Sequence, residues 1–385
     1  MTIHVGILDK DPIRLLTPPL DERTECTNMV LIGDKSQYPI FERIQRVLKR
    51  YDIDSEFFEI PDVVNTTALH GALQSLITYL ESKNTTVKLN ASCGIRHRLL
   101  SVYENFRHNR WPIYVVEPNS DRMCWLYPQN KDDIQVQDKI TVEDYLTIFG
   151  ARAEFTEQAS QISDSLFNIG KKWASNALEL GPGLATLNYL ATTCRKGQTL
   201  SVELSDKQQT YKELATLIQD LVDVGLATYQ NGTLTFATDD CRRFSNGEWL
   251  ETYVHKSIEL IKHSMPTIQD QALNVQVYRQ AANKEVRNEL DVATVVNNKL
   301  HIIECKTKGM RDDGDDTLYK LESLRDLLGG IQARAMLVSF RPLRYNDISR
   351  AKDLGLALIG PEELAELDRH LLQWFSKAGG HSFLN

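Results

Sequence analysis

Short apolar runs alternate with amphipathic stretches over the first 150 residues of the chain. Five runs have the length and composition of buried strands: 29–32, 57–60, 87–89, 113–116 and 123–126. The stretches between them space apolar residues three and four positions apart, which predicts helices; one such face holds Phe41, Ile44, Val47 and Leu48. Strands that alternate with helices over short connections predict a mainly parallel, Rossmann-like α/β sheet for residues 1–150.

Sheets of this kind bind ligands at the carboxyl ends of their strands. The loops at 33–37 and 90–96 lie at two such ends, so Gly33 and Ser36 are candidate ligand residues of the first loop. The second loop opens a helix, where free backbone amides suit a phosphate. Arg98 and its neighbours add positive charge there. We expect a ligand-binding site between these loops, although a plain strand-to-helix turn has the same outline.

Residues 151–243 have a mostly helical pattern. Leucine and isoleucine side chains between 214 and 221 are spaced as one face of a helix, and a β-hairpin centred on Asn231-Gly232 follows. A helix followed by a hairpin is the outline of a winged helix. Residues 205–243 hold four basic and six acidic residues, whereas a wing that binds a duplex needs cations for the phosphates. We expect a structural connector, with a nucleic-acid-binding role as the alternative.

Residues 244–385 predict a third α/β unit. The expected elements are a helix from 247, strands at 273–278, 289–296 and 299–306, a helix at 317–328, and strands at 335–339 and 356–359. The three units fit the length of the chain, since domains commonly hold roughly 100–200 residues.

The second and third strands of this last unit gather charged residues on one face. If residues 297–298 form a two-residue turn, Asp291 lies opposite Glu304 and Glu289 lies opposite Lys306. Opposed residues share a face of the sheet, so all four side chains are expected to point the same way. The other face is expected to join a core and holds Leu290, Val292, Val296, Ile303 and Cys305.

Two opposed carboxylates repel each other unless a cation lies between them. Oxygen ligands favour a hard ion such as Mg²⁺ or Mn²⁺, which polarises a phosphodiester and lowers the pKa of a bound water. Lys306 could then orient that water or stabilise the charge that develops on phosphorus. A solvated strand face with a Glu289–Lys306 salt bridge explains the same pattern without any catalysis.

Composition places this chemistry in a soluble globular protein. Hydrophobic residues make up 42% and charged residues 25% of the 385, and the net charge is −8. The values exclude long disorder, and they argue against a sequence-reading DNA binder while leaving room for one local basic groove. Six cysteines without a CxxC pair, no signal peptide and no membrane span indicate a cytoplasmic protein with reduced thiols.

Asp291 followed by Glu304-Cys305-Lys306 on consecutive strands resembles the PD-(D/E)xK nuclease signature, although Leu290 stands where the motif has proline. The resemblance implies a restriction-endonuclease-like fold, with Asp291 and Glu304 as metal ligands and Lys306 as the catalytic lysine. It also implies that Glu251, on the preceding helix, is an accessory ligand. Glu289 is a further candidate.

Residues 89–96, Leu-Asn-Ala-Ser-Cys-Gly-Ile-Arg, are similar to the ligand loop of CARF domains (CRISPR-associated Rossmann fold). The resemblance implies that Asn90, Ser92, Gly94 and Arg96 bind a cyclic oligoadenylate. Together, the three units resemble the CRISPR ancillary nucleases that cyclic oligoadenylates activate in antiviral defence. That family implies a homodimer with one cyclic tetra-adenylate across its two-fold axis and an RNA or DNA substrate.

Two alternatives remain open. One is a ligand-responsive regulator that binds nucleic acid through the winged helix, and the other is an unregulated repair or restriction nuclease. The sequence does not distinguish RNA from DNA, single from double strands, or the ring size of the activator.

Overall fold

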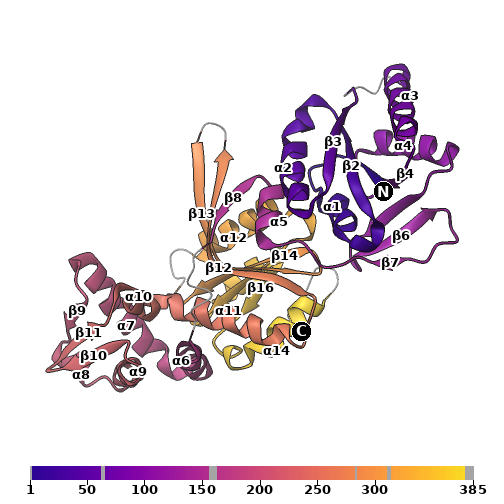
Figure 1. Ribbon diagram of the computed structural model, residues 1–385. Helices are drawn as coiled ribbons and strands as arrows, with labels where there is room; N and C mark the ends of the chain where they lie inside the picture. Colours follow the sequence, from indigo (N-terminus) through magenta and orange to yellow (C-terminus); the bar gives the residue numbers. More distant parts are fainter. Residues whose placement is uncertain (1, 62–65, 156–162, 282–283, 310–313, 378–385) are drawn as a thin grey trace.

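The computed structural model describes residues 2–61, 66–155, 163–281, 284–309 and 314–377. The strands in these residues form sheets of seven, three and six strands. The seven-stranded sheet and the three-stranded sheet lie at opposite ends of an elongated molecule, and the six-stranded sheet lies between them (Figure 1). We call the three parts the N-terminal domain, the connector and the C-terminal domain.

The N-terminal sheet has the order β3-β2-β1-β4-β5-β6-β7, and its first five strands in space are parallel. The strands are β1 (Thr2–Ile7), β2 (Cys26–Gly33), β3 (Asp54–Glu59), β4 (Thr86–Asn90), β5 (Ile113–Glu117), β6 (Arg122–Tyr127) and β7 (Ile134–Gln135). The predicted Rossmann-like sheet is therefore confirmed. The prediction missed β1, a fully buried strand at the centre of the sheet.

Helices cover both faces of this sheet. Side chains of α3 (Thr66–Ser82) and α4 (Arg96–His108) pack in the core on one face. The other face is covered by α1 (Ile13–Leu20), α2 (Tyr38–Leu48) and α5 (Val142–Ile148).

The connector contains the predicted winged-helix outline. Its helices are α6 (Asp164–Ser175), α7 (Ala177–Gly197), α8 (Asp206–Gln209), α9 (Lys212–Asp223) and α10 (Asp239–Arg243). Strands β9 (Ser201–Glu203), β10 (Ala227–Gln230) and β11 (Thr233–Phe236) form a small sheet with β11 at its centre. The predicted hairpin turn is confirmed, because Asn231 and Gly232 both have the positive φ that a type I′ turn requires.

The C-terminal sheet has the order β16-β15-β14-β13-β12-β8. Its strands are β8 (Ala151–Glu154), β12 (Ile268–Ala281), β13 (Lys284–Val296), β14 (Lys299–Lys306), β15 (Arg334–Ser339) and β16 (Ala357–Ile359). Its helices are α11 (Trp249–Lys262), α12 (Gly314–Gly329), α13 (Tyr345–Asp353) and α14 (Leu367–Ser376). Strand β8, which the sequence interpretation placed in the connector, instead pairs with β12 at the edge of this sheet.

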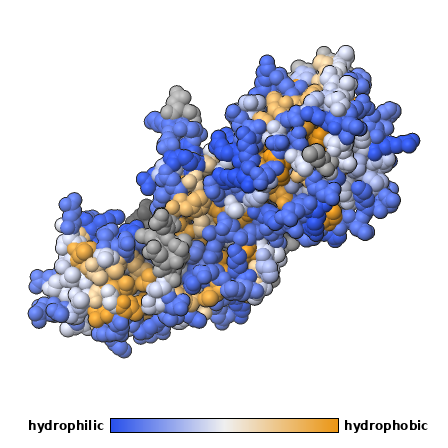
Figure 2. Space-filling view, viewed as in Figure 1, coloured by the Kyte–Doolittle hydropathy of each residue, from blue (hydrophilic) through white to orange (hydrophobic). Residues whose placement is uncertain are grey.

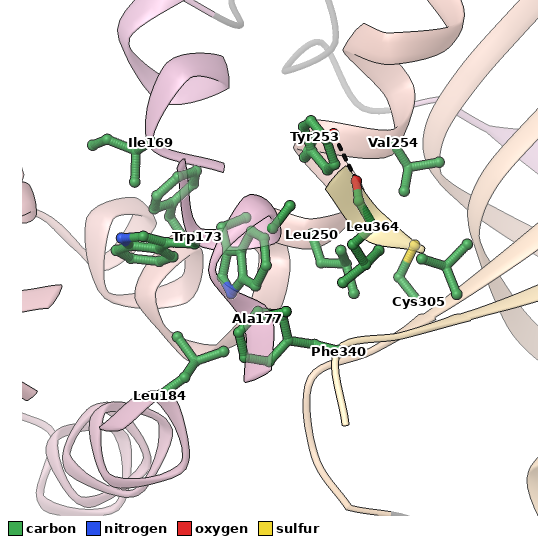
Figure 3. Packing of buried hydrophobic residues seen from close by; sticks show 14 of the residues in the cluster. Ile169, Trp173, Ala177, Leu184, Leu250, Tyr253, Val254, Cys305, Phe340 and Leu364 are labelled. Atoms are coloured by element: carbon green, nitrogen blue, oxygen red, sulfur yellow. Dashed lines mark hydrogen bonds between the residues drawn. The ribbon is translucent and has the colours of Figure 1, made fainter. Parts of the chain in front are cut away.

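The C-terminal domain shares one core with each neighbour. On the connector side, Trp173 of α6 makes an edge-to-face contact with Trp249 of α11, which makes another with Phe340 after β15 (Figure 3). On the opposite side, Leu8 and Tyr145 of the N-terminal domain belong to the same buried cluster as the residues of β14 and α12. Because buried apolar area stabilises at about 25 cal/mol per Å², these continuous cores hold the three parts together.

Candidate active site and ligand loops

The β13–β14 hairpin has the predicted register only over part of its length. The pairs run from Val296 opposite Lys299 to Val292 opposite Ile303, as the two-residue turn requires. Beyond that point β13 and β14 no longer pair with each other. Strand β13 continues beside β12, and β14 continues beside β15. The expected cross-strand pairs of Asp291 with Glu304 and of Glu289 with Lys306 are therefore not part of the ladder.

Asp291 lies at the fork where the strands part. Its Oδ2 accepts a hydrogen bond from the backbone N–H of Cys305 at 2.7 Å, a donor that the hairpin ladder no longer uses. The carboxylate thus satisfies a buried amide at the point of divergence. Lys306 donates a hydrogen bond to Glu304, so the salt bridge that the sequence suggested between Lys306 and Glu289 is not the one that forms.

The prediction that Leu290 and Val292 of β13 face the same core is wrong, and the error lies at the same position. Val292 packs in the core shared with the connector, whereas Leu290 packs in the core shared with the N-terminal domain. Residues two apart on a regular strand share a face, so the alternation breaks at Asp291. Asn274, between the β12 residues paired with Val292 and Leu290, has a left-handed φ of 53°, so β12 departs from extended backbone at the same level of the sheet.

Burial and neighbouring negative charges raise the pKa values of two carboxylates at the fork, Asp291 and Glu251. Burial and then the charge of Glu304 raise the pKa of Asp291 to about 7. Burial, followed by the charges of Asp291 and Glu248, raises the pKa of Glu251 well above its ordinary value. Glu289 is exposed, but its charge contributes to both shifts, so it lies within electrostatic reach of the group. The four predicted acids therefore lie within electrostatic reach of one common region at the fork.

Lys306 keeps its positive charge inside this acidic group. Burial opposes the charge, but the attraction and hydrogen bond of Glu304 outweigh it and raise the pKa of Lys306 above its ordinary value. A protonated lysine beside a developing negative charge is a suitable electrostatic stabiliser.

A pocket of about 290 Å³ opens beside these residues, and its walls come from two domains. The C-terminal domain contributes Glu248, Glu251 and the segment 305–308, and the connector contributes arginines. Among the described residues, the lining is Arg195, Arg242, Arg243, Asn246, Gly247, Glu248, Glu251, Cys305, Lys306, Thr307 and Lys308. Arg243 also forms an ion pair with Glu248 at 3.3 Å.

The sequence interpretation missed these arginines and Glu248. It judged the connector by its net charge. Net charge hides this local group of arginines, because Asp239 and Asp240, which pair with Arg242 and Arg243, cancel their charges in the sum. The available signal was the adjacent pair Arg242-Arg243, just before the helix that carries Glu251.

The donor set suits a hard cation, with help from water or substrate. Among the described residues, no three His, Cys, Asp or Glu side chains converge tightly enough to hold a metal ion by themselves. A mutually repelling carboxylate group is nevertheless what a divalent cation stabilises, and Mg²⁺ commonly takes only one or two carboxylates and completes its shell with water and phosphate oxygens. The residues present therefore fit such an ion.

In the N-terminal domain, Asn90 and Ser92 shape the second ligand loop from within. Asn90 is fully buried, donates to the carbonyl of Arg14 at 2.8 Å and accepts from the backbone and hydroxyl of Ser92. Ser92 Oγ in turn accepts from the N–H of Val116 at 2.8 Å. These bonds tie the ends of β4 and β5 to α1.

Gly94 and Arg96 occupy the surface of this loop. Gly94 has φ 110° and lies so close to β1 that a Cβ would stand 2.7 Å from Ile7 Cγ2. Its N–H donates to Asp9 Oδ2 at 3.2 Å, which brings the loop after β1 into the site. Arg96 is exposed at the start of α4 and free to meet a ligand.

The loop at 33–37 is joined to the second loop through a buried ion pair. Ser36 hydrogen-bonds Asp34, and Gly33 packs against Gln37 and Leu8. Arg98, expected to add surface charge, is instead 1% exposed and donates to Asp34 at 2.9 Å. An arginine on this helix face turns inward because Asp34 neutralises it.

The geometry defines a class of protein: a Rossmann-like domain with a loop site, joined through a winged-helix connector to an α/β nuclease domain. Residues 238–378 match the family model of the Card1-like endonuclease domain. No protein with a curated description matches the chain.

Solved structures show the same architecture over the whole length. The crystal structure of VC1899 from Vibrio cholerae is 65% identical, with 99% of both chains covered and a TM-score of 0.94. Can2 from Sulfobacillus thermosulfidooxidans, solved in complex with cyclic tetra-adenylate, is 21% identical, with 98% and 100% covered and a TM-score of 0.78. A type III CRISPR defence DNA nuclease activated by cyclic oligoadenylate is 13% identical, with 95% of this chain and 51% of that chain covered, at a TM-score of 0.55.

The chain therefore belongs to the family of VC1899, and its C-terminal domain is a Card1-like endonuclease domain. In the described part of the chain, every helix is too short or too polar to cross a bilayer.

Proposed function

We propose that this protein is a divalent-metal-dependent endonuclease that a cyclic oligoadenylate switches on in CRISPR antiviral defence. The observation that carries the proposal is the convergence of Asp291, Glu304, Lys306 and Glu251 at the β13–β14 fork, inside a Card1-like endonuclease domain. Raised carboxylate pKa values, such as those of Asp291 and Glu251, are typical of sites that bind a cation or move a proton.

In this proposal Asp291 and Glu304 hold Mn²⁺ or Mg²⁺, with Glu251 as a further ligand and Glu289 as a less central acid. The bound ion would polarise the scissile phosphodiester and acidify a water. Lys306, held by Glu304, orients the attacking water and stabilises negative charge on the phosphate. Arg195 and Arg243 line the same pocket and bind the phosphates of the RNA or DNA strand.

The N-terminal domain is the proposed sensor. The structural likeness to Can2, whose structure contains cyclic tetra-adenylate, supports this ligand. Gly94 lets the ligand approach the loop, Arg96 offers a cation, and Asn90 and Ser92 hold the loop in shape. Gly33 and Ser36 line the neighbouring loop. Two copies of the chain would enclose one symmetric ring, which implies a homodimer in the cytoplasm.

The deciding experiment is a cleavage assay in Mn²⁺ with single-stranded RNA, single-stranded DNA and supercoiled plasmid, each with and without cyclic tetra-adenylate. Wild type and Glu304→Ala are compared. We expect cleavage only with the ligand, and a loss of at least about a hundredfold in Glu304→Ala, because a ligand and a charge partner of Lys306 are lost together.

Three other results would contradict parts of the proposal. Equal cleavage with and without the ligand would indicate an unregulated nuclease. Cleavage that survives in Glu304→Ala would place the chemistry elsewhere. Tight, Glu304-independent binding of duplex DNA without any cleavage would favour the regulator that uses the winged helix.

A further inference from the structure

A second pocket lies beside the active-site pocket, on the exposed face of α7. It has a volume of about 280 Å³, close to the ~300 Å³ at which pockets for small molecules begin. We call it the α7 pocket and define it by its lining: Ala185, Asn188, Tyr189, Thr192, Thr307, Lys308, Gly309 and Arg341.

The α7 pocket continues the active-site pocket. Both are lined by Thr307 and Lys308, the two residues that follow Lys306. Helix α7 also contributes to both, with Arg195 at the active site and Tyr189 in the α7 pocket. A strand whose phosphate lies at Lys306 would therefore reach this pocket with its next nucleotide.

The chemistry of the α7 pocket suits a nucleotide. Tyr189 is 64% exposed, an unusual position for a large ring, and aromatic rings of this kind stack on bases. In Figure 2 apolar residues are visible at the surface of the connector, and further patches of them lie over the other two domains.

Two cations line the same pocket as Tyr189. Lys308 and Arg341 form no ion pair with any described acidic residue, so both are available to phosphate oxygens. Asn188 adds a polar group: it is 4% exposed, its Nδ2 donates to Thr307 at 3.3 Å, and its Oδ1 has no partner among the described residues. An aromatic face, free cations and an unsatisfied amide together point to a ligand that has both a base and a phosphate.

We propose that the α7 pocket binds the nucleotide adjoining the scissile phosphate, with its base stacked on Tyr189 and its phosphate held by Arg341 and Lys308. The inference rests on the proposed function, because it takes the neighbouring pocket as the site of cleavage. It assigns to the connector a direct part in holding the substrate strand.

Binding measured without cleavage tests the proposal. The probe is a short fluorescein-labelled oligonucleotide, as DNA and as RNA, titrated with the full-length protein in EDTA and followed by anisotropy. For the better-bound of the two, Tyr189→Ala should weaken binding by about 5-fold to about 100-fold, the range expected for loss of one stacked base. Tyr189→Phe keeps the ring and should stay within about twofold of wild type.

Abasic oligonucleotides locate the base. Bases are removed from the oligonucleotide one at a time. At one position, the abasic site should weaken binding to the wild type about as much as Tyr189→Ala weakens binding of the intact oligonucleotide. Removing that base should cost Tyr189→Ala nothing further, since the two changes delete one contact. Leu178→Ala is the matched control: Leu178 is exposed on the same helix but lines neither pocket, so this variant should bind as wild type does.

Unchanged binding by Tyr189→Ala, or equal sensitivity of both proteins to every abasic site, would overturn the proposal. So would a change of oligomeric state in both Tyr189→Ala and Leu178→Ala, measured by light scattering, because the α7 face would then meet a second copy of the chain. If binding depends on Tyr189 but wild type cleaves no strand in Mn²⁺, the nucleotide pocket stands and the proposed nuclease function fails.

Discussion

Gly247 shows how closely the active-site segments approach one another. It has φ 131°, and a Cβ on it would lie 2.7 Å from the hydroxyl of Thr307, which lines both pockets. The residue lies at a kink immediately before α11, the helix that carries Glu251. Glycine at this position lets the connector pass against the end of β14 without displacing either element.

Gly247→Ala is therefore expected to lower the free energy of unfolding by about 1–3 kcal/mol through backbone strain and the contact with Thr307. It should also slow cleavage, because Glu251 and Lys306 move apart. Gly71→Ala is the matched control. Gly71 lies inside α3 with open space around it, and alanine there should stabilise the helix by roughly 0.5–1 kcal/mol. Urea unfolding and cleavage rates are measured for both variants. If Gly247→Ala changed stability and cleavage no more than Gly71→Ala does, the close approach at Gly247 would not matter for the site.

The β13–β14 hairpin connects the active site at one end with the N-terminal domain at the other. At its fork it carries Asp291 and Glu304, and its turn is held by the N-terminal domain. Asn298 is 3% exposed and donates to Asp121 and to the carbonyl of Gln137, both in the N-terminal domain. Asp121 is 6% exposed, and this burial raises its pKa to about 6. Strand β14 thus runs directly from the domain contact to Lys306.

Replacing Asn298 by glycine removes its hydrogen bonds to the N-terminal domain while keeping the conformation of the turn. Asn298 and Asn297 both have left-handed φ, so glycine keeps the turn at either position. Asn298→Gly should cost about 1–3 kcal/mol of unfolding free energy, because buried hydrogen bonds to Asp121 and Gln137 are lost. Asn297→Gly should be nearly neutral, since its side chain has no hydrogen bond among the described residues. Thermal or urea unfolding measures the stability of both variants. Similar losses of unfolding free energy in the two would refute a stabilising role for the contact between Asn298 and the N-terminal domain.

At the scale of the whole molecule, the endonuclease domain is covered on both sides. One core joins it to the connector and another joins it to the N-terminal domain. Coupling between a ligand and the active site needs two arrangements with different affinities for the ligand. Continuous packing from the ligand loops to the fork is the physical link through which such a difference could act.

Cyclic tetra-adenylate should stabilise the whole protein, by about 2.7 kcal/mol at a hundred times its Kd. Arg96→Ala should reduce the rise in Tm at a given ligand concentration and leave the Tm without ligand nearly unchanged, because Arg96 is exposed. Glu304→Ala should keep the full ligand-dependent rise, since Glu304 belongs to the other domain. Thermal unfolding at several ligand concentrations measures this. Loss of the rise in Glu304→Ala would show that the ligand binds elsewhere.

Local patterns in the sequence determined most of the elements. Apolar spacing predicted the helices and strands, and the left-handed residues Asn231, Asn297 and Asn298 marked two hairpin turns that the structure contains. The expected hairpin register placed Asp291, Glu304 and Lys306 in one neighbourhood, and the resemblance to the PD-(D/E)xK signature added Glu251. Turn chemistry and side-chain periodicity act over a few residues, so a single sequence contains them.

Only the tertiary structure decided which contacts these residues make. The fork at Asp291 depends on the competition of β12 and β15 for the two strands, and Arg98 turns inward because Asp34, from a distant loop, meets it. The arginine wall of the active site and the exposed Tyr189 come from a connector whose sequence is acidic overall. Charges and strand partners from remote segments meet only when the chain folds, so composition and local pattern do not contain them.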